Sequence, residues 1–293
     1  MDIRNNRMMK NTQIKMESIK DKKVKSRVIY NIIMILICLI ISFPFFWMVL
    51  SSFKTGQEII QVPPTFFPKN FTLENYKIIF EKLNFSRFIL NSLIVTIIST
   101  IAAMFTSSLA GYVFAKFNFK GKNIIFILCI SGLMIPFAAI IMPMYIIIST
   151  FGLRNSYLGL ILPFIVNPFG IFLIRQFIET IPNELIEAAR MDGANEFIIY
   201  LKVILPNIGS VVGAVGIFNF LLVWNNLLWP LIIISKESMN TLPLGIATLG
   251  YTVGTRYDMI VTGATISVIP VMIVFALAQR QIVSGVTFTG IKA

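Results

Sequence analysis

Residues Phe88–Phe114 read FILNSLIVTIISTIAAMFTSSLAGYVF, a stretch without Asp, Glu, Lys, Arg or His. A helix needs about 20 predominantly apolar residues to cross the hydrocarbon core of a bilayer. Five further runs of comparable length also lack these five residue types, so the sequence predicts an all-α integral membrane protein with six transmembrane helices. The other runs are Val28–Leu50, Ile124–Ile148, Tyr157–Ile174, Ile208–Ile234 and Met259–Ala278.

The composition of the whole chain also indicates lipid as its solvent. Of its 293 residues, 56% are hydrophobic and 13% are charged, whereas soluble domains carry about 25% charged residues. The formal net charge is +12, and most basic residues lie outside the apolar runs. We therefore expect them to face the anionic surface of a lipid bilayer, and we do not expect a nucleic-acid partner.

Few residues in the chain could bind a metal or form a disulfide. Histidine is absent, and the two cysteines, Cys38 and Cys129, each lie inside an apolar run. No spacing typical of a metal site or a disulfide framework is present. We interpret both cysteines as small hydrophobic residues, and we expect neither a metal nor a cofactor on this chain.

The distribution of Lys and Arg predicts the orientation of the chain. Nine lie before the first run, three follow the second, three follow the fourth and two lie in the C-terminal tail. These 17 outnumber the eight on the other side, so both termini are predicted to be cytoplasmic. The expected organisation is a basic tail (1–27), a first transmembrane helix (28–50), an extracellular loop (51–87), a core of five helices (88–279) and a cytoplasmic tail (280–293).

One predicted cytoplasmic segment, residues 181–206, reads IPNELIEAARMDGANEFIIYLKVILP. Its start suits a helix because Pro and Asn precede acidic residues that favour the positive end of the helix dipole. Gly193 suits a left-handed helix stop, and a second helix should begin near Asn195 and end before Pro206. An ordinary amphipathic hairpin on the membrane surface fits the same pattern. One helix face is shallow and open to close approach by another surface; it holds Leu185, Ala188, Ala189 and Asp192.

Three motifs in this order resemble those of a known family. Glu187-Ala188-Ala189, Gly193 and Ile204-Leu205-Pro206 resemble the EAA loop of permease subunits in ATP-binding-cassette importers. Residues 187–194 are similar to the carbohydrate branch, the maltose-type permeases. Residues 224–230, WNNLLWP, resemble that branch's Trp-Asn-Asp-x-x-Trp-Pro, with Asn226 in place of Asp, and residues 279–287 resemble the family's ending.

The resemblance implies a type I ABC-importer permease (MetI-like) fold in a bacterial plasma membrane. It also implies a second, related permease, two ATP-binding-cassette ATPase subunits and an extracellular solute-binding protein that delivers sugar. The EAA loop would dock on an ATPase and couple its movement to the translocation pathway. By position in the motif, the coupling residues are Glu187, Ala188, Ala189, Arg190, Asp192 and Gly193.

The chain lacks the phosphate-binding motif Gly-x-x-x-x-Gly-Lys-Ser/Thr. We therefore expect it not to be an enzyme and not to hydrolyse ATP, which a separate subunit would use. An ion-coupled secondary transporter or channel for a small neutral solute is the alternative. Such proteins place ionisable groups inside the membrane, and the six runs contain no Asp, Glu, Lys, Arg or His. A membrane-embedded enzyme is a further alternative, but this chain has no histidine and no carboxylate inside the six runs with which to catalyse a reaction.

Polar and aromatic residues inside the apolar runs are candidates for contact with a solute. Asn167 precedes Pro168, which should distort its helix, and Asn219 and Asn226 would share a face of the fifth span. A hydrogen bond between helices is the alternative role for each asparagine. Trp224 and Trp229 could stack on a sugar or belong to an outer aromatic belt. The candidates for the substrate path are Asn167, Asn219, Trp224 and Asn226.

Overall fold

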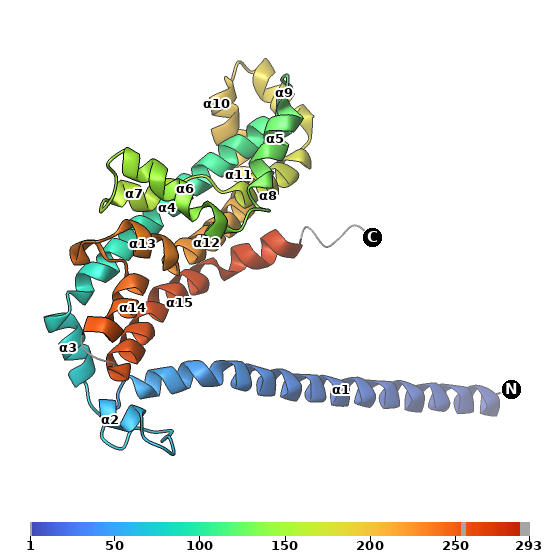
Figure 1. Cartoon of the computed structure of the whole chain (residues 1–293). Helices are drawn as coiled ribbons and strands as arrows, with labels where there is room; N and C mark the ends of the chain where they lie inside the picture. The colour runs from blue at the N-terminus through green and yellow to red at the C-terminus, as the bar shows by residue number, and fades with distance from the viewer. Residues whose placement is uncertain (1, 253–255, 288–293) are drawn as a thin grey trace.

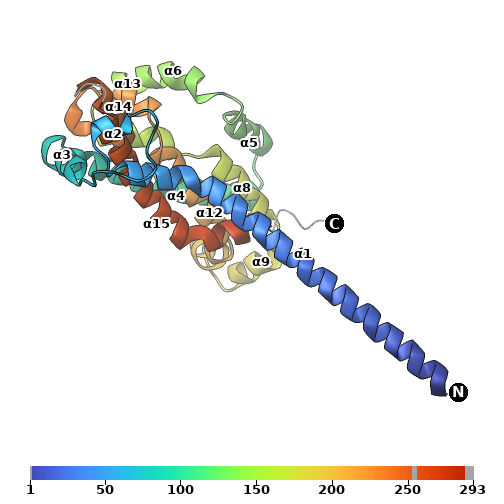
Figure 2. The same cartoon turned by 90° about the horizontal axis from the view of Figure 1, so that it is seen from below.

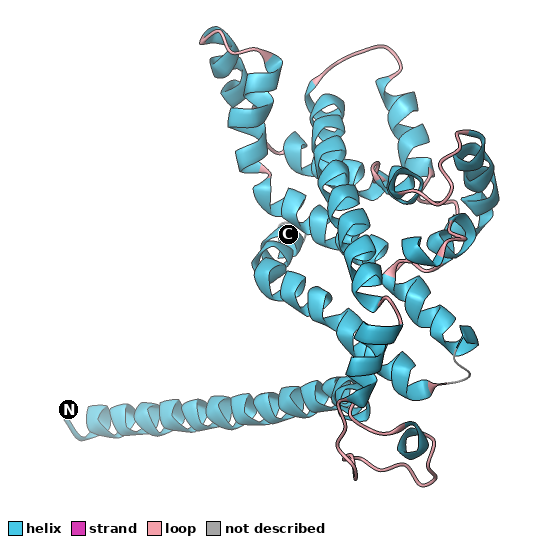
Figure 3. Cartoon of the chain, turned by 90° about the vertical axis from the view of Figure 1, so that its left-hand side faces the viewer, coloured by secondary structure: helices cyan, strands magenta, loops and turns pink. Residues whose placement is uncertain are grey.

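The computed structural model describes residues 2–252 and 256–287, and every regular element in these ranges is a helix (Figures 1 and 3). The elements are α1 (Asp2–Ser51), α2 (Gly56–Ile59), α3 (Glu74–Lys82), α4 (Phe85–Lys116), α5 (Lys122–Ser131), α6 (Phe137–Thr150), α7 (Tyr157–Ile161), η1 (Leu162–Phe164), α8 (Pro168–Glu179), α9 (Asn183–Met191), α10 (Glu196–Ile199), η2 (Tyr200–Ile204), α11 (Leu205–Asn207), α12 (Gly209–Trp224), α13 (Leu228–Ile233), η3 (Glu237–Met239), α14 (Leu242–Thr252) and α15 (Tyr257–Thr287).

Helix α4 is the central element of the body. It packs against α8 and α12, and α12 also packs against α15. Small residues bring α4 and α8 together, as is common where membrane helices cross closely. A β-carbon at Gly111 would lie 2.7 Å from Ile174 Cγ2, and one at Gly170 would lie 2.7 Å from Ser107 Oγ. Enlarging either glycine would therefore require neighbouring atoms to shift.

Helix α1 leaves the body and extends away from it as a single helix (Figures 1 and 2). Among the side chains of α1 that the structure describes, those of its last turns contact the core, where Thr265 Oγ1 of α15 donates a hydrogen bond to Met48 O over 3.4 Å. The helix is unbroken from Asp2, so the predicted basic tail continues directly into the first apolar run. Large apolar side chains from Val28 to Phe46 are exposed around its circumference, so this surface is available to lipid or to another subunit.

Several of the predicted spans are broken or bent. In the described residues, three helices are long and apolar enough to cross a membrane, or five if each bent pair is one span. The fourth run bends by 41° between η1 and α8, which confirms the distortion predicted at Pro168. The third run forms the short helices α5 and α6 because Gly132 ends one and Pro136 precedes the other in an extended conformation. Helix α12, which lies in the fifth apolar run, ends at Trp224, well before the end of that run at Ile234.

The segment between α1 and α4 folds as an ordered unit at the α2–α3 end of the molecule. Asn75 Nδ2 donates to Ser52 O and Lys54 O over 3.0 and 2.8 Å. Glu58 Oε1 accepts from Thr65 Oγ1 and from the Lys69 amide over 2.8 and 2.7 Å. Burial raises the pKa of Glu58, but these hydrogen bonds outweigh it and hold the pKa below its ordinary value. Side chains of the segment between α1 and α4 thus hold the backbone of the same segment in place.

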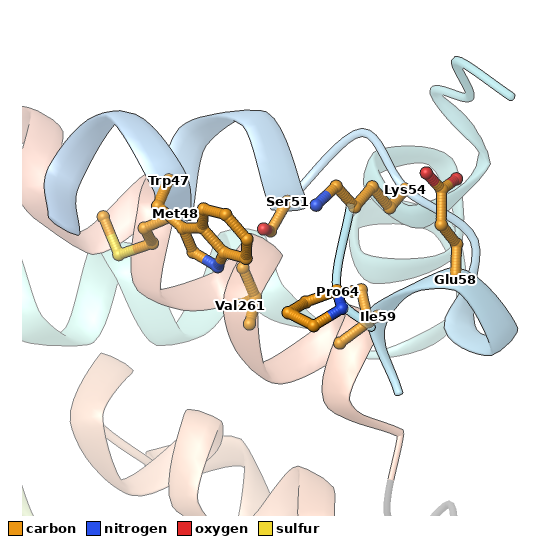
Figure 4. Close-up of a pocket in the computed structure, with 8 residues that line it drawn as sticks. All are labelled: Trp47, Met48, Ser51, Lys54, Glu58, Ile59, Pro64 and Val261. Atoms are coloured by element: carbon orange, nitrogen blue, oxygen red, sulfur yellow. The ribbon is translucent and has the colours of Figure 1, made fainter. Parts of the chain in front are cut away.

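Lys54 is buried in the same unit, beside a cavity of about 160 Å³ (Figure 4). Its ammonium donates to Thr65 O over 2.5 Å and lies 4.6 Å from the centre of the Trp47 ring. The Glu58 carboxylate supplies a nearby negative charge. A buried ammonium needs such partners because desolvation disfavours its charged form.

Candidate functional site

The segment that follows α8 forms a helical hairpin at the opposite end of the molecule, labelled α9 and α10 in Figure 1. Pro182 precedes α9 with φ −58° and ψ 137°, and Glu184 lies in the first turn. Helix α10 begins after Asn195, whose Oδ1 accepts from the Ile198 amide over 2.9 Å. The predicted starts of both helices are therefore confirmed.

The turn between α9 and α10 depends on Gly193, which has φ +81°. The Gly193 amide donates to Arg190 O, and the Ala194 amide donates to Ala189 O, both over 3.0 Å. These are the two bonds of a Schellman motif, which places a left-handed residue at the glycine. The positive φ predicted from the sequence is confirmed. A β-carbon would meet no atom within 4 Å, so backbone conformation alone selects glycine here.

Helix α9 buries one face and leaves another open. Ile186 is 2% exposed and packs in a cluster with Ile178, Ile199 and Tyr200. On the predicted shallow face, Leu185, Ala188 and Asp192 are exposed, and Ala189 is half-buried. Exposure of a Leu beside two alanines leaves a flat apolar surface that another protein can approach closely.

Polar contacts from α4 hold the hairpin in place. Lys116 Nζ donates to Ile181 O over 2.5 Å and to Asn183 Oδ1 over 2.8 Å. Tyr112 Oη donates to Glu196 Oε2 over 2.8 Å. The hydroxyls of Ser108 and Tyr200 lie 2.7 Å apart and share a hydrogen bond. The prediction missed these residues, although the spacing of Ser108, Tyr112 and Lys116 in a helical run could have identified them.

Glu196 joins this set of contacts to α9. Arg190 Nε donates to Glu196 Oε1 over 2.8 Å, so the carboxylate bridges the guanidinium and the Tyr112 hydroxyl. The hydrogen bond from Arg190 lowers the pKa of Glu196 below its ordinary value; burial acts in the opposite direction, and the bond from Tyr112 adds to the lowering. Glu196 is therefore ionised at neutral pH.

The chain after α10 corrects one prediction. The second helix was expected to end before Pro206, but helical backbone continues through a π-turn (η2) and α11 to Asn207. Pro206 lies in the first turn of α11, where a missing amide hydrogen costs little. The axis then bends by 81° between the segment 196–207 and α12.

A hollow of about 500 Å³ lies beside the break between α5 and α6 and the break between η1 and α8. Asn167 caps α8, because its Oδ1 accepts from the Gly170 amide over 3.1 Å. Its Nδ2 donates to Asn219 Oδ1 over 3.2 Å. Asn219 is 2% exposed, and its Nδ2 has no hydrogen-bond partner. The remaining lining is apolar and includes Phe137, Phe164, Phe169, Phe218 and Leu222.

The other two path candidates lie outside this hollow. Trp224 is 1% exposed, stacks on Phe220 and donates from Nε1 to Ser267 O over 3.1 Å. Asn226 lies in the turn after α12, where its Oδ1 accepts from the Trp229 amide over 3.0 Å. The sequence predicted that Asn226 would share a helix face with Asn219. This prediction is wrong, because α12 ends at Trp224, before Asn226. Trp229 is also buried, so neither tryptophan belongs to an aromatic belt.

The chain matches known proteins over most of its length. Residues 107–288 match the family described as "Binding-protein-dependent transport system inner membrane component". The arabinooligosaccharides transport system permease protein AraQ of Bacillus subtilis is 35% identical over 91% of this chain and 96% of its own length. The lactose transport system permease protein LacG of Rhizobium radiobacter is 32% identical, covering 83% and 88% respectively. A chain of a bacterial ABC transporter involved in alginate import has the same fold, with a TM-score of 0.74 and 20% identity over 86% of this chain and 95% of its own.

Proposed function

Because the chain belongs to the family of inner membrane components of binding-protein-dependent transport systems, we propose that it is a permease subunit of an ATP-driven sugar importer. It forms half of the translocation pathway for a sugar or oligosaccharide. The observation that carries this proposal is the full-length similarity to permeases named for arabinooligosaccharides and lactose.

The chemistry of the hollow beside Asn219 supports a neutral, hydroxylated solute. Its lining contains asparagine amides and apolar or aromatic side chains, and no charged residue. The unpaired Nδ2 of buried Asn219 is a donor that a hydroxyl oxygen could satisfy, which would remove the cost of leaving it unbonded. Asn167 and Asn219 are therefore our substrate-path residues, while Trp224 and Asn226 lie outside the hollow.

The proposed arrangement in the membrane has six spans and both termini in the cytoplasm. Each broken run counts as one span, since lining of a cavity permits irregular backbone at membrane depth. The excess of Lys and Arg on the α9–α10 side supports a cytoplasmic location for that end. The α2–α3 end then faces outward, toward a solute-binding protein. The membrane is the bacterial plasma membrane.

The hairpin of α9 and α10 is the proposed site of coupling to an ATPase. The open face of Leu185, Ala188 and Asp192 supports docking of another protein. Glu187 and Arg190 flank this face, and Gly193 sets the direction in which α10 leaves α9. Two ATPase subunits use ATP, and this chain itself binds no cofactor. A second, related permease completes the pathway.

The test is sugar uptake by cells that lack this chain. Loss of uptake of arabinooligosaccharide or lactose, restored by a plasmid copy, would support the proposal. Asn219→Leu should still assemble and should raise the KM for uptake, because it keeps the side-chain size but removes the free Nδ2 and also the Oδ1 that accepts from Asn167. Unchanged uptake of every saccharide tested in cells without the chain would contradict sugar import.

A further inference from the structure

Helix α4 carries three polar side chains at intervals of four residues near its C-terminal end. Ser108, Tyr112 and Lys116 follow the i, i+4, i+8 spacing and therefore share one face. Ser108 is 1% exposed and Tyr112 is 2% exposed. Buried polar groups in a membrane helix are costly unless they are bonded, and each of these has its partner in the segment 181–207. We call these three residues the α4 ladder, and we call the contact that each makes with the segment 181–207 a rung.

Each residue of the α4 ladder contacts a different part of the segment 181–207. Lys116 holds its first residues through Ile181 O, and Tyr112 holds the first residue of α10, Glu196. Ser108 holds the first residue of the π-turn, Tyr200. Apolar packing at Ile186 and Ile199 resists separation from α4 but tolerates sliding, whereas hydrogen bonds depend on direction. Three directional contacts along one helix therefore fix the register of the segment on α4.

The same helix reaches the hollow through the residues just before the ladder. Thr106 Oγ1 donates to Ile165 O over 2.6 Å, and Ser107 Oγ donates to Asn167 O over 3.4 Å. Both acceptors lie in the break between η1 and α8. Helix α4 is continuous from Phe85 to Lys116 and has no internal proline, so a displacement at the ladder is carried to Asn167 with little loss.

We propose that the α4 ladder makes α4 the element that carries movement of the segment 181–207 to the hollow at Asn167, with the Tyr112–Glu196 contact as its central rung. The inference rests on the proposed function, because it assumes that an ATPase moves this segment. Ser108, Tyr112, Lys116 and Glu196 are positioning residues: they touch neither ATP nor the solute.

Tyr112→Phe tests the central rung with little change in packing. The ring keeps its contacts with Phe117 and Tyr200, and only the hydrogen bond to Glu196 is lost. The matched control is Tyr157→Phe, which removes the 2.7 Å bond from Tyr157 Oη to Asn91 Oδ1 near the other end of α4. Each variant is measured in the assembled transporter, by sugar uptake, by ATP hydrolysis with loaded binding protein and by amide hydrogen exchange.

We expect Tyr112→Phe to lower sugar transported per ATP by about tenfold, the factor expected for losing one hydrogen bond to a charged group. ATP hydrolysis should remain stimulated, and amides 183–199 should exchange faster. Glu196→Gln should act in the same direction, although it also removes the ion pair with Arg190. The double variant should be no worse than Glu196→Gln alone, since both changes act on the Tyr112–Glu196 contact. Tyr157→Phe should leave the transport ratio and the exchange of 183–199 unchanged.

The outcomes separate this inference from the proposed function. If the wild-type transporter shows no ATP-dependent uptake of any saccharide, the proposed function fails, while hydrogen exchange still reports whether the rung holds the segment. If Tyr112→Phe leaves exchange of 183–199 unchanged, the rung does not position the segment and the inference is wrong. Faster exchange with a normal transport ratio also overturns it, because the contact is then only structural. Ser108→Ala gives the same readouts if Tyr112→Phe assembles poorly.

Discussion

The two ends of this molecule are both rich in polar contacts, but the contacts are made differently. At the α2–α3 end, Glu58 and Asn75 bond to backbone groups of their own segment, so most polar contacts of that unit are internal, and Thr262 of α15 adds one to Ser52 O. At the α9–α10 end, the hairpin is held by side chains of α4, and its outer face is exposed. The first arrangement suits a fixed platform, and the second suits a segment that moves together with one helix.

Replacement of Glu58 by Ala should have the largest effect, and it should act on stability. It leaves the Lys69 amide and the Thr65 hydroxyl without an acceptor and removes the charge beside buried Lys54. Breaking such a buried set costs about 3 kcal/mol. We expect a lower melting temperature and less assembled subunit in the membrane. Exposed Gln57→Ala is the control; equal stability of both variants would show that the platform does not depend on this network.

Gly193 variants should affect transport while leaving assembly nearly intact. A β-carbon at φ +81° costs roughly 1 kcal/mol of backbone strain, small against the packing of the whole subunit. Gly193→Ala should redirect α10, with strongly reduced uptake and loss of stimulated ATP hydrolysis, and Gly193→Asp should act more strongly. Both activities are normalised to assembled transporter.

The control for Gly193 is Gly152→Ala. Gly152 has φ +69°, and a β-carbon there also meets nothing within 4 Å, so the strain is matched at a site far from the hairpin. We expect normal uptake from this variant. If the Gly193 variants transport as well as Gly152→Ala does, the hairpin is not the coupling element.

Leu185→Ser should weaken docking without affecting the fold of the subunit. Leu185 is 48% exposed on the open face of α9, and burying a Leu in an interface is worth about 2 kcal/mol. Less ATPase should copurify with the variant at equal amounts of permease. Met191→Ser is the control, since Met191 is 87% exposed but lies off that face. Equal loss from both changes would argue against a specific face.

The smallest effect should come from pH. The pKa values of Glu58 and Glu196 are both lowered from 4.5, so each carboxylate stabilises the folded state above that pH and loses this effect as the pH falls through its folded value. Between pH 6 and 8, neither group should titrate. The melting temperature should therefore be flat across this range, and so should the protection factors of amides 183–199 once the base-catalysed rise in intrinsic exchange is divided out. A transition in either within this range would show that one carboxylate is protonated near neutrality.

Local patterns predicted the hairpin well. The helix start at Asn195 and the left-handed conformation of Gly193 depend on residues within a few positions, so both were predicted from the sequence. Contacts between distant segments were not predictable: Tyr112 and Glu196 are 84 residues apart, and Ser108 and Tyr200 are 92 apart. The burial of Trp224 was missed for a similar reason. Its partner, Ser267 O, belongs to another helix, and hydropathy does not distinguish a protein core from lipid.

Helix α1 carries a consequence for how cells must make this protein. It is synthesised before the other described elements, and as a helix it satisfies its own backbone, so it can enter the bilayer ahead of them. In the finished subunit the most apolar part of its stretch Arg27–Ser51 is still uncovered. A copy made in excess of its partners would therefore keep an unshielded apolar helix, a feature by which membrane proteases can recognise orphan subunits. Balanced synthesis of this chain and the proposed partner subunits would limit such exposure.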